Sequence, residues 1–125
     1  MKIYNQIPYC FLLLLFFSCS EQKPNFDFER WRQDEDGCSN HRVSLLKDYE
    51  QINDYLMQKS GKEIVALLGK PDITELSKRH IKTYIYFIDP KENRCNANES
   101  QKLSRASCIE FNSIGKVSII SQQMR

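Results

Sequence analysis

Residues 60–72, which read SGKEIVALLGKPD, contain signals for both ends of a short helix. Ser60 and Glu63 match a capping box, in which the serine oxygen accepts from the N3 amide and the glutamate accepts from the cap amide. Gly69 suits the left-handed position after a helix, and the proline two residues later cannot continue one. The sequence therefore predicts a helix over residues 61–68. Because two turns are not stable alone, this helix must pack on other elements.

A longer amphipathic helix is predicted upstream, from about residue 40 to about residue 58. Its apolar side chains recur three and four residues apart, which places them on one face of a helix. They are Leu45, Tyr49, Ile52 and Leu56. Such a stripe usually lies in a core, so we expect both helices to pack on the elements that follow.

Three strands are predicted downstream, over residues 83–88, 107–112 and 116–121, which are rich in β-branched and aromatic residues. Gly115 supplies the positive φ of a tight hairpin between the last two strands. The interval 89–105 is almost entirely polar and is expected to be a loop outside the core. Two N-terminal helices on one face of a three-stranded antiparallel sheet make a two-layer α+β domain of order α-α-β-β-β.

Aromatic side chains suggest two packing surfaces. A segment before the helices is expected to clasp the domain through Phe26, Phe28 and Trp31. The sheet face that the helices leave open is predicted to carry Tyr84, Tyr86, Ile88 and Ile120. Exposed aromatics on a sheet face can mark a binding site. The candidate partner surface is therefore formed by Tyr84, Tyr86 and Trp31, unless the clasp buries the tyrosines.

The first 18 residues have the layout of an export signal, with Lys2 early, an apolar run over residues 7–17 and a small residue at the end. Thirteen of these residues are apolar, whereas apolar residues make up 41% of the whole chain. The run is 11 residues long and contains Pro8, so it is too short for a membrane-spanning helix, which needs about 20. We therefore predict a signal peptide over residues 1–18.

The end of this run, Phe16-Phe17-Ser18-Cys19, resembles the cleavage site of a bacterial lipoprotein signal. In that class the cysteine thiol receives a diacylglyceryl group and the new N-terminus is acylated. Cysteine suits this chemistry because its thiolate is nucleophilic, and two or more acyl chains hold a protein on a membrane. By the same resemblance, Ser20 implies sorting to the outer membrane. The alternative is an ordinary secretory signal, with Cys19 as a free or bridging thiol.

Three cysteines follow Cys19, at positions 38, 95 and 108. With Cys19 they make four cysteines outside the leader, a number that is ordinary in an oxidising compartment and high for a reduced one. One disulfide is possible, either Cys38–Cys95 or Cys95–Cys108. We prefer Cys38–Cys95, which explains why an irregular N-terminal stretch and a polar loop each carry one cysteine. Cys108 is then the spare thiol.

Neither catalysis nor metal binding is predicted. Cys38 and His41 have C-x-x-H spacing, but the sequence has no second paired motif of this kind, and export favours disulfides over zinc. A nucleophilic site needs a serine or cysteine with a histidine and an acid. The other histidine, His80, lies in a basic surface stretch. We therefore expect no enzyme, no cofactor and no metal.

The charge of the chain is nearly balanced, with 18 basic and 16 acidic residues. Nucleic-acid-binding domains usually have a basic face and a pI above about 9, whereas the pI here is about 8.3. We expect no nucleic-acid partner. The basic stretch 78–82, KRHIK, is interpreted as a solvated turn, with a phosphate or lipid-headgroup site as the alternative.

Three motifs together resemble the SmpA/OmlA (BamE-like) family of small bacterial lipoproteins. They are EIVALLGKPD at 63–72, YIYF at 84–87 and FNSIGKV at 111–117, and the resemblance covers about residues 44–121. It implies a periplasmic, lipid-anchored accessory domain that binds other proteins or lipid and has no catalytic activity. The helix and strand order also resembles the half-domains of secreted β-lactamase inhibitor proteins.

The expected organisation is a signal peptide (1–18), a lipidated Cys19 with tether and clasp (19–38) and a BamE-like α+β domain (39–125). The expected function is a non-catalytic, lipid-anchored accessory protein of the outer membrane. Its expected partners are the membrane, through the lipid on Cys19, and other envelope proteins. The alternative is a periplasmic inhibitor or ligand-binding module that uses the open sheet face.

Overall fold

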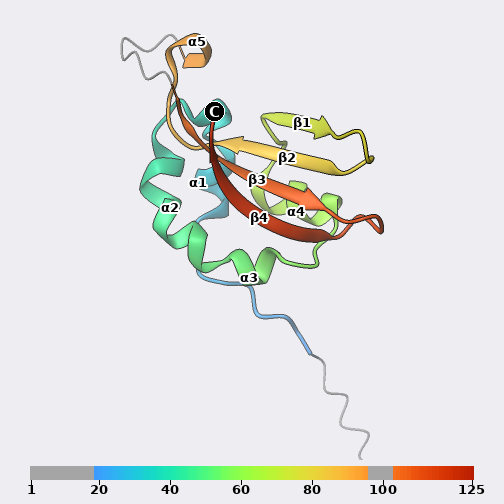
Figure 1. The fold of residues 1–125 in the computed structure, drawn as a ribbon. Helices are drawn as coiled ribbons and strands as arrows, with labels where there is room; N and C mark the ends of the chain where they lie inside the picture. Colours follow the sequence, from blue (N-terminus) through green and yellow to red (C-terminus); the bar gives the residue numbers. More distant parts are fainter. Residues whose placement is uncertain (1–18, 96–102) are drawn as a thin grey trace, which may run out of the picture.

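The computed structural model describes residues 19–95 and 103–125. The signal peptide predicted over residues 1–18 therefore lies outside the described residues. Within the described ranges the chain forms the predicted α+β class of fold, in which helices cover one face of an antiparallel sheet (Figure 1).

The sheet has four antiparallel strands in the described residues, in the order β1-β2-β3-β4. They are β1 (Ile73–Leu76), β2 (Lys82–Phe87), β3 (Arg105–Phe111) and β4 (Val117–Met124). The prediction of three strands is wrong because it missed β1. This strand has four residues, all exposed, so it carries no alternation of buried and exposed positions. Only its pairing with β2, which places Ile73 opposite Ile85, makes it a strand.

The helices of the described residues are α1 (Phe28–Arg32), η1 (Glu35–Gly37, a 3-10 helix), α2 (His41–Gln51), α3 (Asn53–Leu56), α4 (Gly61–Leu68) and α5 (Glu92–Cys95). The helix predicted over 61–68 is confirmed as α4. Ser60 Oγ accepts from the Glu63 amide at 3.2 Å, and Gly69 follows the helix with a φ of 85°. The longer predicted helix is divided at Ile52, where φ is −95° and ψ is 5°.

The N-terminal segment is part of the core. Asp27 caps α1 by accepting from the Arg30 amide at 3.0 Å. This helix stacks Trp31 on Tyr49, with ring centroids 4.3 Å apart. Phe26, Phe28 and Trp31 are all buried, so the contact predicted for these aromatic side chains is present, although helix α1 itself was not predicted.

The sheet faces are opposite to the predicted ones. Tyr84, Tyr86 and Ile88 lie toward the helices in the main core cluster, and Ile120 packs against that cluster. Ile85 and Phe87 point to the other side of the sheet. Because every residue from 84 to 88 is buried, alternation along β2 does not distinguish one face from the other.

The polar interval 89–105 is more ordered in its described part than a solvated loop. Helix α5 lies within it, and β3 begins at its end. Asp89 accepts hydrogen bonds from the Arg105 guanidinium at 2.8 and 2.7 Å and from the Arg105 amide at 2.9 Å. These bonds hold the pKa of Asp89 below its usual value. The ion pair between Asp89 and Arg105 therefore joins the first and last residues of this interval.

Candidate functional site

Cys19 lies at the start of the described chain with an exposed, free thiol. The segment after it forms no helix or strand before α1 begins. It nevertheless contacts the fold, because Glu21 accepts a hydrogen bond from Lys59 Nζ at 2.8 Å. The Lys59 side chain is only 7% exposed, and its ammonium group lies 4.1 Å from the centre of the Tyr55 ring. The predicted tether therefore leaves the fold beside the start of α4.

Cys38 and Cys95 form a disulfide with a Cα–Cα distance of 5.4 Å, which is the pairing that we preferred. The bridge joins the segment between η1 and α2 to the end of α5. Cys108 is free and buried, and burial raises the pKa of its thiol. Because Cys38 is in a disulfide, it offers no thiolate for a zinc site with His41.

Peptide mapping tests this bridge. Trypsin digestion of the exported, unreduced protein, alkylated after unfolding, is expected to release peptides 33–42 and 95–102 as one linked pair. Peptide 106–116 is expected to carry alkylated Cys108, because this thiol is free. A mass that corresponds to 95–102 linked to 106–116 would contradict the assignment. A reduced sample, in which the three peptides separate, is the control.

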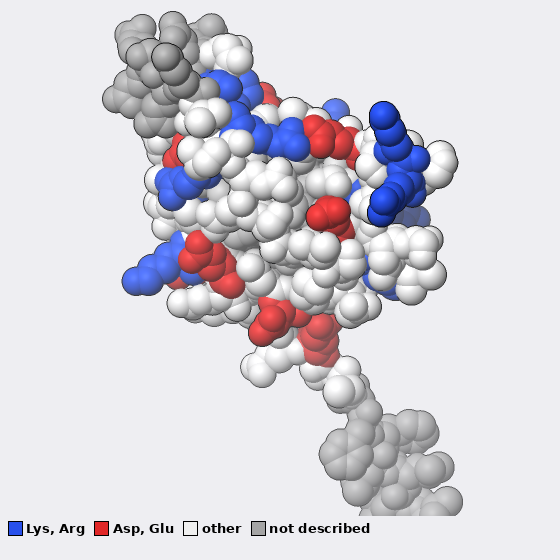
Figure 2. All heavy atoms as spheres, in the orientation of Figure 1, with Lys and Arg blue, Asp and Glu red and all other residues white. Residues whose placement is uncertain are grey.

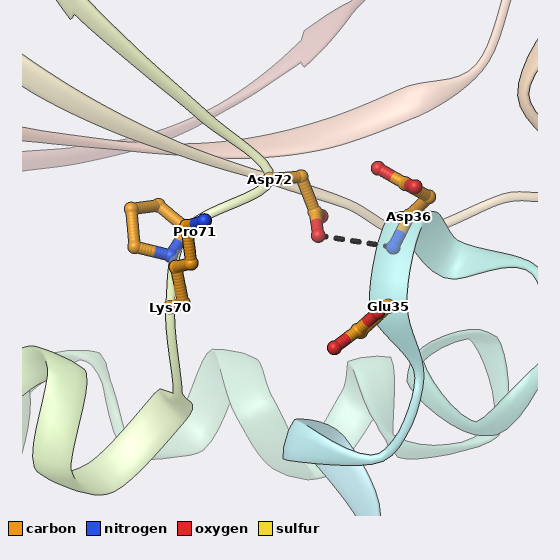
Figure 3. Close-up of a pocket in the computed structure, with 5 residues that line it drawn as sticks. All are labelled: Glu35, Asp36, Lys70, Pro71 and Asp72. Carbon is orange, nitrogen blue, oxygen red and sulfur yellow. Dashed lines mark hydrogen bonds between the residues drawn. The ribbon is translucent and has the colours of Figure 1, made fainter.

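The motif LLGKPD ends in a buried polar hub, which we define as Asp34, Arg42 and Asp72. Asp72 accepts from the amides of Asp36 at 2.9 Å and Phe87 at 2.8 Å, and it also pairs with the Arg42 guanidinium. Figure 3 shows the Asp72 side chain directed at the backbone of η1. Asp72 therefore holds η1 against the end of β2.

Arg42 completes the hub from α2. Its guanidinium donates to the carbonyl oxygens of Trp31 at 3.2 Å and Phe87 at 2.9 Å. Asp34 fixes the start of α2 by accepting from the amides of Ser39 at 2.6 Å and Arg42 at 2.9 Å. Sequence reasoning missed the hub, because no local pattern distinguishes Arg42 from the solvated residues of the same helix.

A second bond ties two of the sequence motifs together. The Tyr86 hydroxyl, from YIYF, donates to the carbonyl oxygen of Gly69, from LLGKPD, at 2.8 Å. Burial raises the pKa of Tyr86, which keeps this hydroxyl protonated and able to donate. Both motifs thus have a structural role where α4 turns into the sheet.

A small open hollow of about 180 Å³ lies beside the hub and is lined by Glu35, Asp36, Lys70, Pro71 and Asp72 (Figure 3). Both carboxylate oxygens of Asp72 already accept hydrogen bonds. In this structure the Asp72 carboxylate thus serves as an acceptor for the backbone of η1 and β2. In residues 19–95 and 103–125, no three His, Cys, Asp or Glu side chains are grouped so as to hold a metal ion.

The partner surface predicted from Tyr84, Tyr86 and Trp31 is wrong. Their exposed fractions are 7%, 0% and 0%, because the helices and the N-terminal segment cover them. The outer face of the sheet instead carries a cluster of Ile85, Phe87, Ala106 and Cys108. Cationic side chains cover part of it, since the Arg94 guanidinium lies 3.5 Å from the centre of the Phe87 ring. Arg125 also crosses this face to pair with Glu75.

No family model, curated protein or solved structure matches this chain. The resemblance to the SmpA/OmlA family stays a prediction that depends on the three sequence motifs. No helix in the described part of the chain combines the length and apolar character needed to cross a membrane.

Proposed function

We propose that this protein is a lipid-anchored accessory protein of the bacterial cell envelope, acylated at Cys19 and without catalytic activity. It sits on the outer membrane and binds other envelope proteins, in the manner implied by the SmpA/OmlA-like motifs. The observation that carries the proposal is the position of Cys19, which follows an apolar leader and has an exposed, free thiol.

The geometry of the tether supports the proposal. Phe26, the first of the described side chains that is buried in the core, lies seven residues after Cys19. An extended chain of this length spans about 25 Å at most. An acyl group on Cys19 would therefore keep the folded domain close to the bilayer surface.

The disulfide supports an exported location. Structural disulfides persist in oxidising compartments such as the bacterial periplasm and are rare in the cytosol. The Cys38–Cys95 bridge joins segments 57 residues apart in the sequence. It is therefore a long-range constraint on the fold that fits an oxidising environment.

The roles of the buried charged groups support a non-catalytic function. Asp34, Arg42 and Asp72 use their hydrogen bonds to join α1, α2, η1 and β2. The alternative of an inhibitor or ligand-binding module that uses Tyr84 and Tyr86 is not proposed, because both side chains are buried.

Acyl labelling and fractionation test the proposal. In bacteria that process lipoproteins, the chain is expected to incorporate labelled palmitate and to sediment with membranes. Cys19→Ala is expected to abolish the label and to release the mature domain from membranes washed at high salt, because the acylated thiol is gone and salt screens any remaining charge contact. Cys10→Ala is the matched control and is expected to leave both properties unchanged. Label that persists in the Cys19→Ala variant would refute acylation at this residue.

A further inference from the structure

Two hairpin turns and the start of α4 meet at one end of the sheet. A hollow of about 170 Å³ between them is lined by Gly61 of α4, by His80 and Lys82 of the β1–β2 hairpin, and by Asn112 and Gly115 of the β3–β4 hairpin. Figure 1 shows both turns at the end of the sheet opposite α5. The two turns therefore form one surface.

Basic side chains gather on this surface. We define the basic tip as Lys78, Arg79, His80 and Lys82, all of which are exposed. Figure 2 shows blue side chains gathered where Figure 1 places the β1–β2 turn. Among the described residues, no carboxylate lies within ion-pair distance of Lys78, Arg79 or Lys82. The basic tip thus presents positive charge to a partner outside the fold.

Large apolar side chains lie at the same two turns. Ile114, in the β3–β4 turn, is 77% exposed, and Leu76, at the end of β1, is 67% exposed. These are the two highest values among the exposed large hydrophobic residues described. Basic residues beside exposed apolar ones are typical of surfaces that lie in the headgroup region of a bilayer.

The tether reaches the fold next to this surface. Glu21 binds Lys59, whose carbonyl oxygen accepts from the Val117 amide at 2.8 Å. The next residue, Ser60, bridges to Lys116 at the base of the β3–β4 turn. Glu21 is therefore held near the start of β4, at the same end of the sheet as the β3–β4 turn, and Cys19 lies two residues before it.

We propose that the basic tip, with Ile114 and Leu76, is a second membrane contact that binds a bilayer surface rich in anionic phospholipid headgroups. The cations bind the phosphates, and the two apolar side chains enter the interfacial region. In the cell this contact depends on the proposed acyl anchor at Cys19, which brings the domain to the membrane. It fixes the orientation of the domain, with α5 and the disulfide directed away from the bilayer.

Vesicle co-sedimentation of the full chain with Cys19→Ser, which carries no acyl group on that residue, tests the contact. The protein is expected to bind vesicles of phosphatidylglycerol and phosphatidylcholine more tightly than vesicles of phosphatidylcholine alone. Each cation at an anionic surface contributes roughly fivefold, so Lys78→Gln/Arg79→Gln/Lys82→Gln is expected to weaken binding roughly a hundredfold. Ile114→Ser is expected to weaken it roughly tenfold, without a change in the circular dichroism spectrum.

The matched control removes three exposed cations elsewhere, in Arg30→Gln/Lys47→Gln/Lys70→Gln. It has the same net charge as the tip variant and the same leader, so a much smaller loss of binding supports a localised contact. Equal losses in the two triple variants would overturn the proposal, as would equal binding to both kinds of vesicle. Neither outcome bears on acylation, which the palmitate label tests separately.

Discussion

Trp31→Ala is expected to lower the free energy of unfolding by about 3–5 kcal/mol, the range for deletion of a large aromatic side chain from a core. Trp31 is fully buried although it lies in a five-residue helix near the N-terminus. It stacks on Tyr49 and lies under the Arg42 guanidinium, at 5.3 Å from the ring centre. Alanine would leave a cavity between α1, α2 and the sheet.

Chemical denaturation followed by circular dichroism measures this effect, because Trp31 is the single tryptophan of the chain and its fluorescence is lost in the variant. Arg30→Ala, at the exposed neighbouring position in α1, is the control and is expected to change stability by about 0.5 kcal/mol or less. If both variants unfold at the same denaturant concentration, the N-terminal segment does not belong to the cooperative core.

The second large effect is expected at the polar hub. Asp72→Ala would leave the Arg42 guanidinium buried without its carboxylate, and removal of one partner of a buried ion pair costs about 3–5 kcal/mol. The side chains of Arg42 and Asp72 are only 1% and 4% exposed, so water does not replace the missing partner. The amides of Asp36 and Phe87 would also lose their acceptor.

A double-mutant cycle separates the ion pair from the other contacts. Arg42→Met together with Asp72→Ala is expected to cost less than the sum of the two single changes, by about 0.5–3 kcal/mol, because neither charge is then left alone. Glu75→Ala is the matched control, since it breaks the more exposed pair with Arg125. It is expected to cost about 1 kcal/mol or less. An Asp72→Ala variant as stable as Glu75→Ala would show that the hub does not stabilise the fold.

The N-terminal segment connects the two proposed membrane contacts. Cys19 is where an acyl group would attach, and Glu21, two residues later, binds Lys59 near the base of the β3–β4 turn. Anchoring alone would leave the domain free to rotate about its tether. Contact through the basic tip would restrict that rotation and present one end of the domain to envelope proteins.

Local chemistry was sufficient for several features of this protein. The serine, glutamate and glycine around residues 60–69 determine α4, because caps act on backbone groups within one turn. Aromatic and β-branched runs indicated β2, β3 and β4, and the α+β class followed from the order of elements. The preferred disulfide, Cys38–Cys95, is present, and its choice required only that both cysteines lie outside the predicted helices and strands.

Other features were decided only by the tertiary structure. Strand β1 exists because β2 offers it a free edge, and its own four residues carry no periodic signal. The sequence did not predict which side of the sheet Tyr84 and Tyr86 face, because β2 is apolar on both faces. It also did not predict which face of the sheet the N-terminal aromatic side chains cover. Arg42 and Asp72, 30 residues apart, become a pair only where the start of α2 meets the residue just before β1. Caps and strand propensity act over a few residues, whereas burial and charge pairing depend on which distant segments meet.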